Sequence, residues 1–211
     1  HCTEADINIS GKKISIRTGL IGRHNIENII AAAALLDGRV SPADIKKAAG
    51  KFKTVKGRLE TVSGGNISVF VDFAHTPDGI ENTLRALTEA KEKRIISVFG
   101  AGGNRDKGKR PLMAAAAAKY SDIVYLTSDN PRFEKPDAII KDVVKGFPGK
   151  SRFIVEPDRK RAVEAAVREA RRGDIVVIMG KGHEEYQETA GRKTPFSDAK
   201  TALAAVKERR L

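Results

Sequence analysis

Alternation between strand-like and helix-like segments is the feature that most constrains the fold of this sequence. Apolar runs of strand length follow Gly57, at Ile67 to Phe73, Arg94 to Phe99, Ile123 to Thr127, Phe153 to Val155, and Asp174 to Met179. Helical patterns lie near 78–90, 108–119, 136–146, 158–172 and 197–209. Because strands separated by helices pair in parallel, the sequence predicts an α/β fold, a mostly parallel sheet with helices on both faces. A hairpin around Tyr186 and Lys193 is expected to add an antiparallel edge.

The first fifty or so residues follow a different pattern. Residues 5–17 alternate polar and apolar side chains around a Ser-Gly-Lys turn, which is typical of a β-hairpin. An apolar, alanine-rich helix is predicted from Ile26 to Leu36, and Ser41-Pro42 is a good start for a second short helix. These elements are too few for a complete domain. We therefore expect residues 1–52 to be the tail of one domain and residues 53–211 to form another.

Composition restricts the class of protein. No apolar run approaches the roughly 18 residues of a membrane helix, and the single cysteine, Cys2, favours a reducing cytoplasm. No signal-peptide pattern opens the chain, and His1 stands first instead of methionine, so we expect a piece cut from a longer polypeptide. The net charge of +12 suits nucleic acid, an anionic membrane or small anionic substrates, and equally a solvated basic surface. The absence of Trp argues against a base-stacking platform.

The segment Asp129-Asn130-Pro131-Arg132 carries the strongest functional signal. It directly follows a predicted buried strand, and the proline stiffens the turn. In open α/β sheets, ligands bind at the carboxyl edge where such strands end. A guanidinium held at that edge can grip a planar carboxylate with two parallel hydrogen bonds. The segment predicts capture of a small molecule that carries both a carboxylate and an ammonium group.

A glycine-rich loop, Gly100 to Arg110, lies between another strand and helix. Residues 103–110 nearly match a phosphate-binding loop, but Arg110 stands where that loop needs Ser or Thr to hold Mg²⁺. Four cations, Arg105, Lys107, Lys109 and Arg110, follow the glycines. We therefore favour an anion- or substrate-binding loop over a nucleoside-triphosphate P-loop or a merely flexible turn.

Two further strand ends carry polar side chains. Asp72 could accept a hydrogen bond from a ribose hydroxyl and His75 could stack on a ring, although an isolated Asp and His at a strand end are more often structural. After the last long strand, Gly180 permits close backbone approach and Glu184 can accept from an ammonium. His183 has no partners at metal-ligand spacing, so no metal site is predicted.

Taken together, these motifs resemble the Mur ligases of peptidoglycan synthesis. They are Gly57-Arg58-Leu59-Glu60, Asp72 to Asp78, Gly102 to Pro111, Asp129 to Arg132, and Gly180 to Glu184. The resemblance covers nearly the whole chain and is greatest to the members that add meso-diaminopimelate. The family has a UDP-sugar domain, a central ATP-binding domain and a Rossmann-like domain for the incoming amino acid. The resemblance implies that residues 1–52 end the central domain and that residues 53–211 form the Rossmann-like one.

The resemblance also implies individual roles. Residues matching the family's diaminopimelate contacts are Arg105, Asp129, Asn130, Arg132, Gly180 and Glu184, and those matching its nucleotide contacts are Asn25, Arg58, Asp72 and His75. Arg132 would pair with the distal carboxylate of diaminopimelate, while Asp129, Glu184 and the Gly180 carbonyl would take the distal ammonium. Lysine lacks that carboxylate and would leave the guanidinium unpaired, which is a strong basis for rejection.

The implied reaction consumes ATP with Mg²⁺ and joins diaminopimelate to a UDP-N-acetylmuramoyl dipeptide. This sequence holds neither a complete P-loop nor an evident Mg²⁺ cluster, so we expect the chain alone to be inactive, without a tightly bound cofactor, and monomeric. Two alternatives remain at this stage. One is a ligase of the same family that adds lysine or another amino acid, or a related cyanophycin- or folate-type ligase. The other is a basic nucleic-acid-binding module, which only the net charge suggests.

Overall fold

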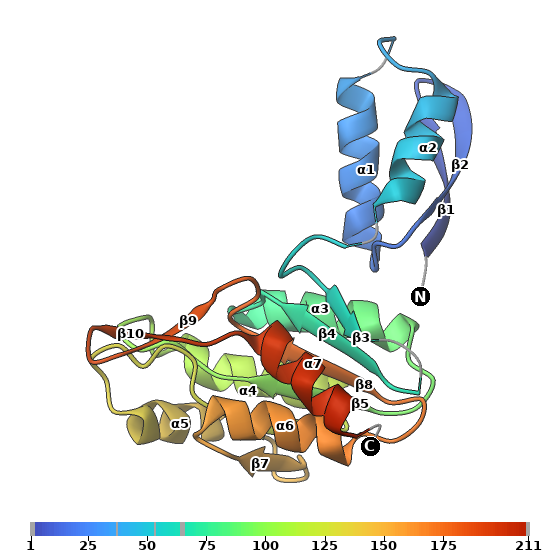
Figure 1. The fold of residues 1–211 in the computed structure, drawn as a ribbon. Helices are drawn as coiled ribbons and strands as arrows, with labels where there is room; N and C mark the ends of the chain where they lie inside the picture. Colours follow the sequence, from blue (N-terminus) through green and yellow to red (C-terminus); the bar gives the residue numbers. More distant parts are fainter. Residues whose placement is uncertain (1–2, 37, 53, 64–65, 210–211) are drawn as a thin grey trace. The chain divides into compact units, whose positions relative to one another are not determined.

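The protein divides into two compact units, residues 1–55 and 56–211. A computed structural model describes residues 3–36, 38–52, 54–63 and 66–209. Figure 1 shows the two units with their helices and strands labelled. None of the described helices is both long and apolar enough to cross a membrane.

The first unit is a hairpin covered by two helices. Strands β1 (Thr3–Ile9) and β2 (Lys12–Thr18) pair antiparallel, and helices α1 (Arg23–Leu35) and α2 (Pro42–Lys51) follow them. Alternate hairpin residues turn inward and pack against buried residues of the two helices. The hairpin contributes Ile7, Ile9, Ile14 and Ile16, and the helices contribute Ile26, Ala33 and Ala49. Ser41 and Asp44 form a reciprocal capping box, which fixes the start of α2. The predicted hairpin and both predicted helices are confirmed.

The second unit contains a six-stranded sheet in the order β3-β4-β8-β5-β6-β7. The strands are β3 (Glu60–Ser63), β4 (Ser68–Asp72), β5 (Ile95–Phe99), β6 (Ile123–Leu126), β7 (Phe153–Val155) and β8 (Ile175–Met179). Neighbours from β4 to β7 pair in parallel, and only β3 is antiparallel. The predicted mostly parallel sheet is confirmed, and the carboxyl ends of its five parallel strands meet at one edge.

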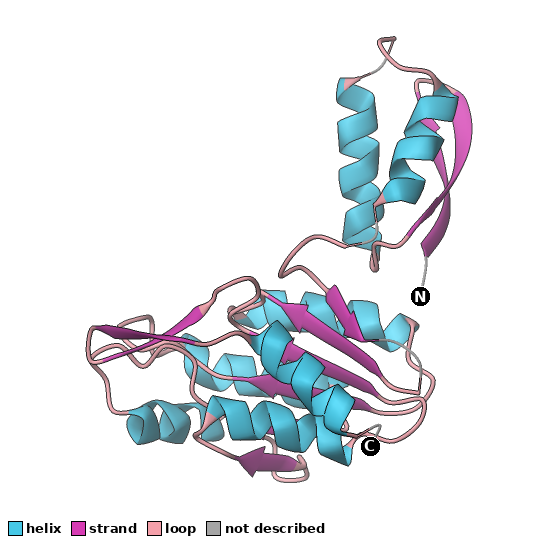
Figure 2. Ribbon diagram, in the orientation of Figure 1, coloured by secondary structure: helices cyan, strands magenta, loops and turns pink. Residues whose placement is uncertain are grey.

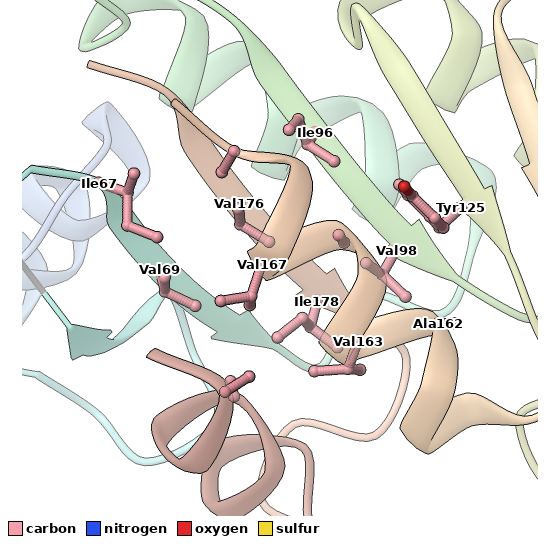
Figure 3. Close-up of a cluster of buried hydrophobic side chains, with 14 of the residues drawn as sticks. Ile67, Val69, Ile96, Val98, Tyr125, Ala162, Val163, Val167, Val176 and Ile178 are labelled. Carbon is pink, nitrogen blue, oxygen red and sulfur yellow. The ribbon is translucent and has the colours of Figure 1, made fainter. Parts of the chain in front are cut away.

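Helices cover both faces of this sheet, as Figure 2 shows. On one face α6 (Arg159–Glu169) packs beside α7 (Asp198–Glu208). Figure 3 shows Val163 and Val167 of α6 against Val98, Val176 and Ile178 of the strands. Strand alternation turns the other residues toward α3 (Pro77–Glu89), α4 (Lys109–Tyr120) and α5 (Pro136–Val144).

One prediction about the sheet is wrong. Strands β9 (Tyr186–Thr189) and β10 (Arg192–Pro195) pair with each other in a separate two-stranded sheet, and the antiparallel edge is β3 instead. The backbone of β9 is engaged elsewhere, because Arg132 N–H donates to the carbonyl of Glu188 and Ala190 N–H donates to that of Arg132. The hairpin therefore lies against the Asp-Asn-Pro-Arg segment.

Candidate functional site

The carboxyl edge of the sheet holds a cleft of about 370 Å³. The loops that follow β4, β5, β6 and β8 line it. All six residues predicted to contact the amino acid reach this cleft: Arg105, Asp129, Asn130, Arg132, Gly180 and Glu184. The structure thus brings together two charged groups from three loops. Arg105 and Arg132 lie beside Gly102 and form the cationic end of the cleft, and Asp129 and Glu184 lie beside Lys181 and form its acidic end.

Arg132 is held at the cationic end by its neighbours. Its Nη1 donates to the Gly103 carbonyl at 2.8 Å, and its Nε lies 3.7 Å from a carboxylate oxygen of Glu188. Arg132 also has a φ of +52°, a left-handed conformation that costs a non-glycine residue about 1–2 kcal/mol. Such strain persists where the surrounding contacts fix the backbone, and here they aim a guanidinium into the cleft.

The loop of Arg132 is locked to the glycine-rich loop. Gly103 N–H donates to the Asn130 carbonyl at 2.9 Å. The Glu134 carboxylate accepts from Asn104 N–H and from the buried guanidinium of Arg110, at 2.5 and 2.8 Å. Hydrogen bonds from Arg110 and Asn104 lower the pKa of Glu134 to about 2. The two loops therefore form one charged, hydrogen-bonded wall.

Two of the four cations expected to bind anions in the glycine-rich loop are engaged within the protein. Arg110 is 1% exposed and also pairs with Asp142 at 3.0 Å, and Lys107 lies 3.7 Å from Glu134. Arg105 and Lys109 are exposed and line the cleft. Of the four cations expected to bind an anion, Arg105 and Lys109 are therefore the two that face the cleft without being engaged in this way.

Asp129 lies at the acidic end with free acceptor capacity. It is 8% exposed, and among the described residues its carboxylate accepts no hydrogen bond. Two buried cations lie just beyond hydrogen-bonding distance, Lys181 Nζ at 3.9 Å and Arg159 Nη1 at 4.0 Å. A nearly buried carboxylate that faces a cleft without a donor is suited to accept from an incoming ammonium.

Gly180 allows this approach. Its φ is +118°, and a Cβ there would lie 2.5 Å from the Asp129 Oδ2 atom. Any side chain at this position would push the Asp129 carboxylate away. Gly180 therefore brings the ends of β6 and β8 within contact of each other.

Asn130 orients Glu184. The Asn130 Nδ2 donates to Glu184 Oε2 at 3.0 Å, and its Oδ1 accepts from Lys181 Nζ at 2.8 Å and from Glu188 N–H at 3.0 Å. Because the amide is 3% exposed and bonded on both sides, it is suited to holding the acidic end of the cleft in place more than to contacting a ligand.

The residues predicted to face a nucleotide divide into two groups. Asp72 is 5% exposed, and its carboxylate accepts from Leu59 N–H, Ala74 N–H and the Thr83 hydroxyl at 2.8–3.0 Å. These bonds indicate that Asp72 anchors the segment before β3, the loop before α3 and the middle of α3. It does not line the cleft.

Arg58 and His75 lie together on the surface. The Arg58 guanidinium carbon is 5.1 Å from the centre of the Phe73 ring, and His75 meets the same ring edge-on at 4.7 Å. His183 stacks on Phe73 at 5.5 Å. This exposed group of two imidazoles, a phenyl ring and a guanidinium suits a planar anionic ligand. Asn25, in the first unit, donates from Nδ2 to the Ile21 carbonyl at 2.8 Å.

Several buried charged residues support the site but were not predicted. Arg159 is fully buried and grips Asp198 with bonds of 2.9 and 2.7 Å, while also donating to the Met179 and Ser128 carbonyls. Lys181 is 0% exposed, and burial lowers its pKa although Asp129 and Glu184 oppose the shift. Lys181 stands between the two glycines of its segment, which was the one available signal.

A metal site is not formed by the part of the chain that the structure describes. No group of three His, Cys, Asp or Glu side chains within it could hold a metal ion. The residues present therefore do not fit Mg²⁺, and no chemical step is assigned to it here.

Comparison with known proteins identifies the family. The family model "Mur ligase, glutamate ligase domain" matches residues 57–182. The chain belongs to the Mur ligase family. The resemblance seen in its motifs is therefore confirmed.

Several proteins similar to this chain are named UDP-N-acetylmuramoyl-L-alanyl-D-glutamate–2,6-diaminopimelate ligase. The protein of that name from Aquifex aeolicus is 48% identical over 193 residues, which are 92% of this chain and 40% of the relative. The one from Chromobacterium violaceum is 46% identical over 197 residues, with the same shares. The chain thus spans about 40% of the length of these relatives.

Solved structures agree. A solved ligase of the same name is 35% identical with a TM-score of 0.76, over 99% of this chain and 43% of that one. The UDP-N-acetylmuramate-alanine ligase of Thermotoga maritima, at 20% identity and a TM-score of 0.66 over 100% of this chain and 45% of that one, shows the shared fold alone.

Proposed function

We propose that this Mur ligase chain binds meso-diaminopimelate in the cleft and presents its amine to an activated glutamyl group. The single observation that carries the proposal is the distribution of charge in the cleft. The guanidinium residues Arg132 and Arg105 both lie beside Gly102, whereas the carboxylates Asp129 and Glu184 both lie beside Lys181. A ligand with a carboxylate and an ammonium on the same carbon matches this pair of ends, and the diaminopimelate ligases similar to this chain supply the candidate.

In the proposed reaction ATP phosphorylates the γ-carboxylate of the D-glutamate in a UDP-N-acetylmuramoyl dipeptide, giving an acyl phosphate and ADP. The amine of diaminopimelate attacks the acyl carbon, phosphate leaves, and the amine loses a proton as the amide forms. The residues of this chain contribute by orienting the amine, which converts a bimolecular attack into an effectively unimolecular one. Closing the cleft against water would protect the acyl phosphate.

We assign residues 1–52 to the end of an ATP-binding domain and residues 53–211 to the amino-acid-binding domain. The division of the chain into two compact units near this boundary supports the assignment. Within the second unit, we propose nucleotide contacts for Arg58 and His75. For the first unit, we propose a nucleotide contact by Asn25. Since the chain matches only about 40% of its relatives, we expect weak ATP binding and no ligation by the chain alone.

The alternatives are less well supported. Lysine offers no carboxylate to the cationic end of the cleft, and the similar proteins named above are diaminopimelate ligases. A nucleic-acid-binding module has only the net charge of +12 in its favour. We further propose a cytoplasmic monomer.

Titration of the ¹⁵N-labelled chain with meso-diaminopimelate and with L-lysine, followed by amide chemical shifts, tests the proposal. We expect diaminopimelate to shift amides of residues 100–106, 128–134 and 180–184, and lysine to bind far more weakly. Equal responses to both compounds, or shifts confined to other segments, would contradict it.

A further inference from the structure

One buried cation touches the acidic end of the cleft without a part in the proposed function. The Lys181 side chain is 0% exposed, at the turn after β8. Its Nζ donates to Asn130 Oδ1 at 2.8 Å and to Glu184 Oε2 at 3.2 Å, and lies 3.9 Å from Asp129. The ring of Tyr186 covers the remaining side at 5.6 Å. Burying an ammonium is expensive unless it is paired, so this placement calls for an explanation.

The charged groups around Lys181, counted together with it, carry a net negative charge. Three carboxylates face the network: Asp129 after β6, Glu184 after β8, and Asp198 on α7. Two cations oppose them, Lys181 and Arg159, which lies 2.7 Å from Asp198 and 4.0 Å from Asp129. The network therefore carries one net negative charge, which is the charge that a single ammonium would neutralise.

We propose that Lys181 is a positioning residue that fixes Asn130 and Glu184 and limits the acidic end of the cleft to one uncompensated negative charge. The inference rests on the proposed function for the identity of the ligand, because it assumes that the incoming cation is the distal ammonium of diaminopimelate. The effect of Lys181 on the net charge of the acidic end is a property of the ligand-free chain, so it does not depend on which ligand binds. The site thus recognises one ammonium and presents the carboxyl groups of Asp129 and Glu184 to it.

Removing the charge of Lys181 should change the protonation of its neighbours. Without it, two carboxylates at one poorly solvated site would repel each other, and one of them would take up a proton near neutral pH. An entering ammonium would then have to displace that proton. The affinity for the ammonium would then depend on pH. It would increase as the pH rises through the pKa of the protonated carboxyl.

Lys181→Met tests this, because methionine keeps an unbranched side chain and removes the charge. The matched control is Lys119→Met, which removes a charge that pairs with Glu81 at the other end of α4 from the cleft. The carboxyl carbons of Asp129 and Glu184 are followed by ¹³C NMR in the ligand-free chains. Calorimetry with meso-diaminopimelate in two buffers of different ionisation enthalpy counts protons exchanged on binding.

In wild type and in Lys119→Met, we expect no net proton exchange when diaminopimelate binds. In Lys181→Met, one carboxyl should hold a proton to higher pH than in wild type, and diaminopimelate binding should release protons and strengthen as the pH rises. Adding Glu184→Gln to Lys181→Met restores the single negative charge, so it should remove the proton release. If Lys181 acted only by packing, these quantities would stay unchanged in Lys181→Met, because methionine keeps the unbranched side chain.

Carboxyl titrations of Lys181→Met that coincide with wild type, together with unchanged proton exchange, would overturn the proposal. If Lys181→Met does not fold, the wild-type titration still decides, because a carboxyl of Asp129 or Glu184 that is protonated at pH 7 contradicts the charge count. Failure of wild type to bind diaminopimelate would refute the proposed function. The ligand-free titration would then decide separately whether Lys181 sets the charge of the cleft.

Discussion

Replacing Arg132 by alanine should abolish the preference for diaminopimelate over lysine. Alanine keeps a Cβ and therefore keeps the strain of the left-handed backbone at φ +52°, so the change isolates the guanidinium. The loss should appear in the affinity for the ligand that has a distal carboxylate. Affinity for lysine should stay nearly constant, because lysine has no distal carboxylate to pair with the Arg132 guanidinium.

The size of the effect follows from the surroundings of the guanidinium. Its side chain is 23% exposed and already donates to the Gly103 carbonyl, so a ligand carboxylate would compete with some water. Hydrogen bonds between charged groups contribute about 1.5–3 kcal/mol each, and a partly solvated pair falls short of the sum of two. We expect a loss of about 2–3 kcal/mol, which is roughly 30- to 150-fold in Kd.

The assay is a thermodynamic cycle of two proteins and two ligands. Wild type and Arg132→Ala are each titrated with meso-diaminopimelate and L-lysine. The selectivity of each protein is the ratio of its Kd for lysine to its Kd for diaminopimelate, and the ratio of the two selectivities measures the coupling between Arg132 and the distal carboxylate. Arg192→Ala, which removes an exposed guanidinium on β10 outside the residues that line the cleft, is the control. An equal loss of affinity for both ligands in Arg132→Ala, or the same loss in Arg192→Ala, would refute the reasoning.

Three further changes probe the framework of the cleft. Gly180→Ala should weaken diaminopimelate binding at least tenfold in calorimetry, because its Cβ would lie 2.5 Å from Asp129 Oδ2; wild-type affinity would refute this. Arg159→Met leaves Asp198 buried and unpaired, so urea unfolding should show a loss of about 3–5 kcal/mol, and a loss below about 1 kcal/mol would contradict it. The pKa of Glu134, about 2, lies below its ordinary value, so its contribution to stability is present above about pH 4.5 and is lost as the pH falls toward 2. Glu134→Gln should therefore lower the urea midpoint at pH 7 more than at pH 3, and equal shifts would count against it.

The sequence allowed the sheet and the carboxyl-edge residues to be predicted because both depend on local pattern. Strands β5, β6 and β8 are uninterrupted apolar runs, and their parallel pairing brings Asp129 and Gly180 to one edge. Strand β3 was missed because the residues Glu60–Ser63 do not alternate between apolar and polar side chains. Its position is set by pairing with β4.

Buried charges were missed for a different reason. Arg159 and Asp198 are far apart in sequence, and only the packing of α6 beside α7 makes them partners. Arg110 looked like an anion-binding residue of a loop, yet Glu134 and Asp142 satisfy it inside the protein. In each case the role of a charged residue depends on a partner that the local sequence does not show.

The orientation of the bound amino acid tests the central claim most directly. A crystal structure of this chain with meso-diaminopimelate should place the distal carboxylate within hydrogen-bonding distance of the Arg132 guanidinium, with the distal ammonium between Asp129 and Glu184. A ligand bound in the reverse direction, outside the cleft, or with its distal end in solvent would contradict the account.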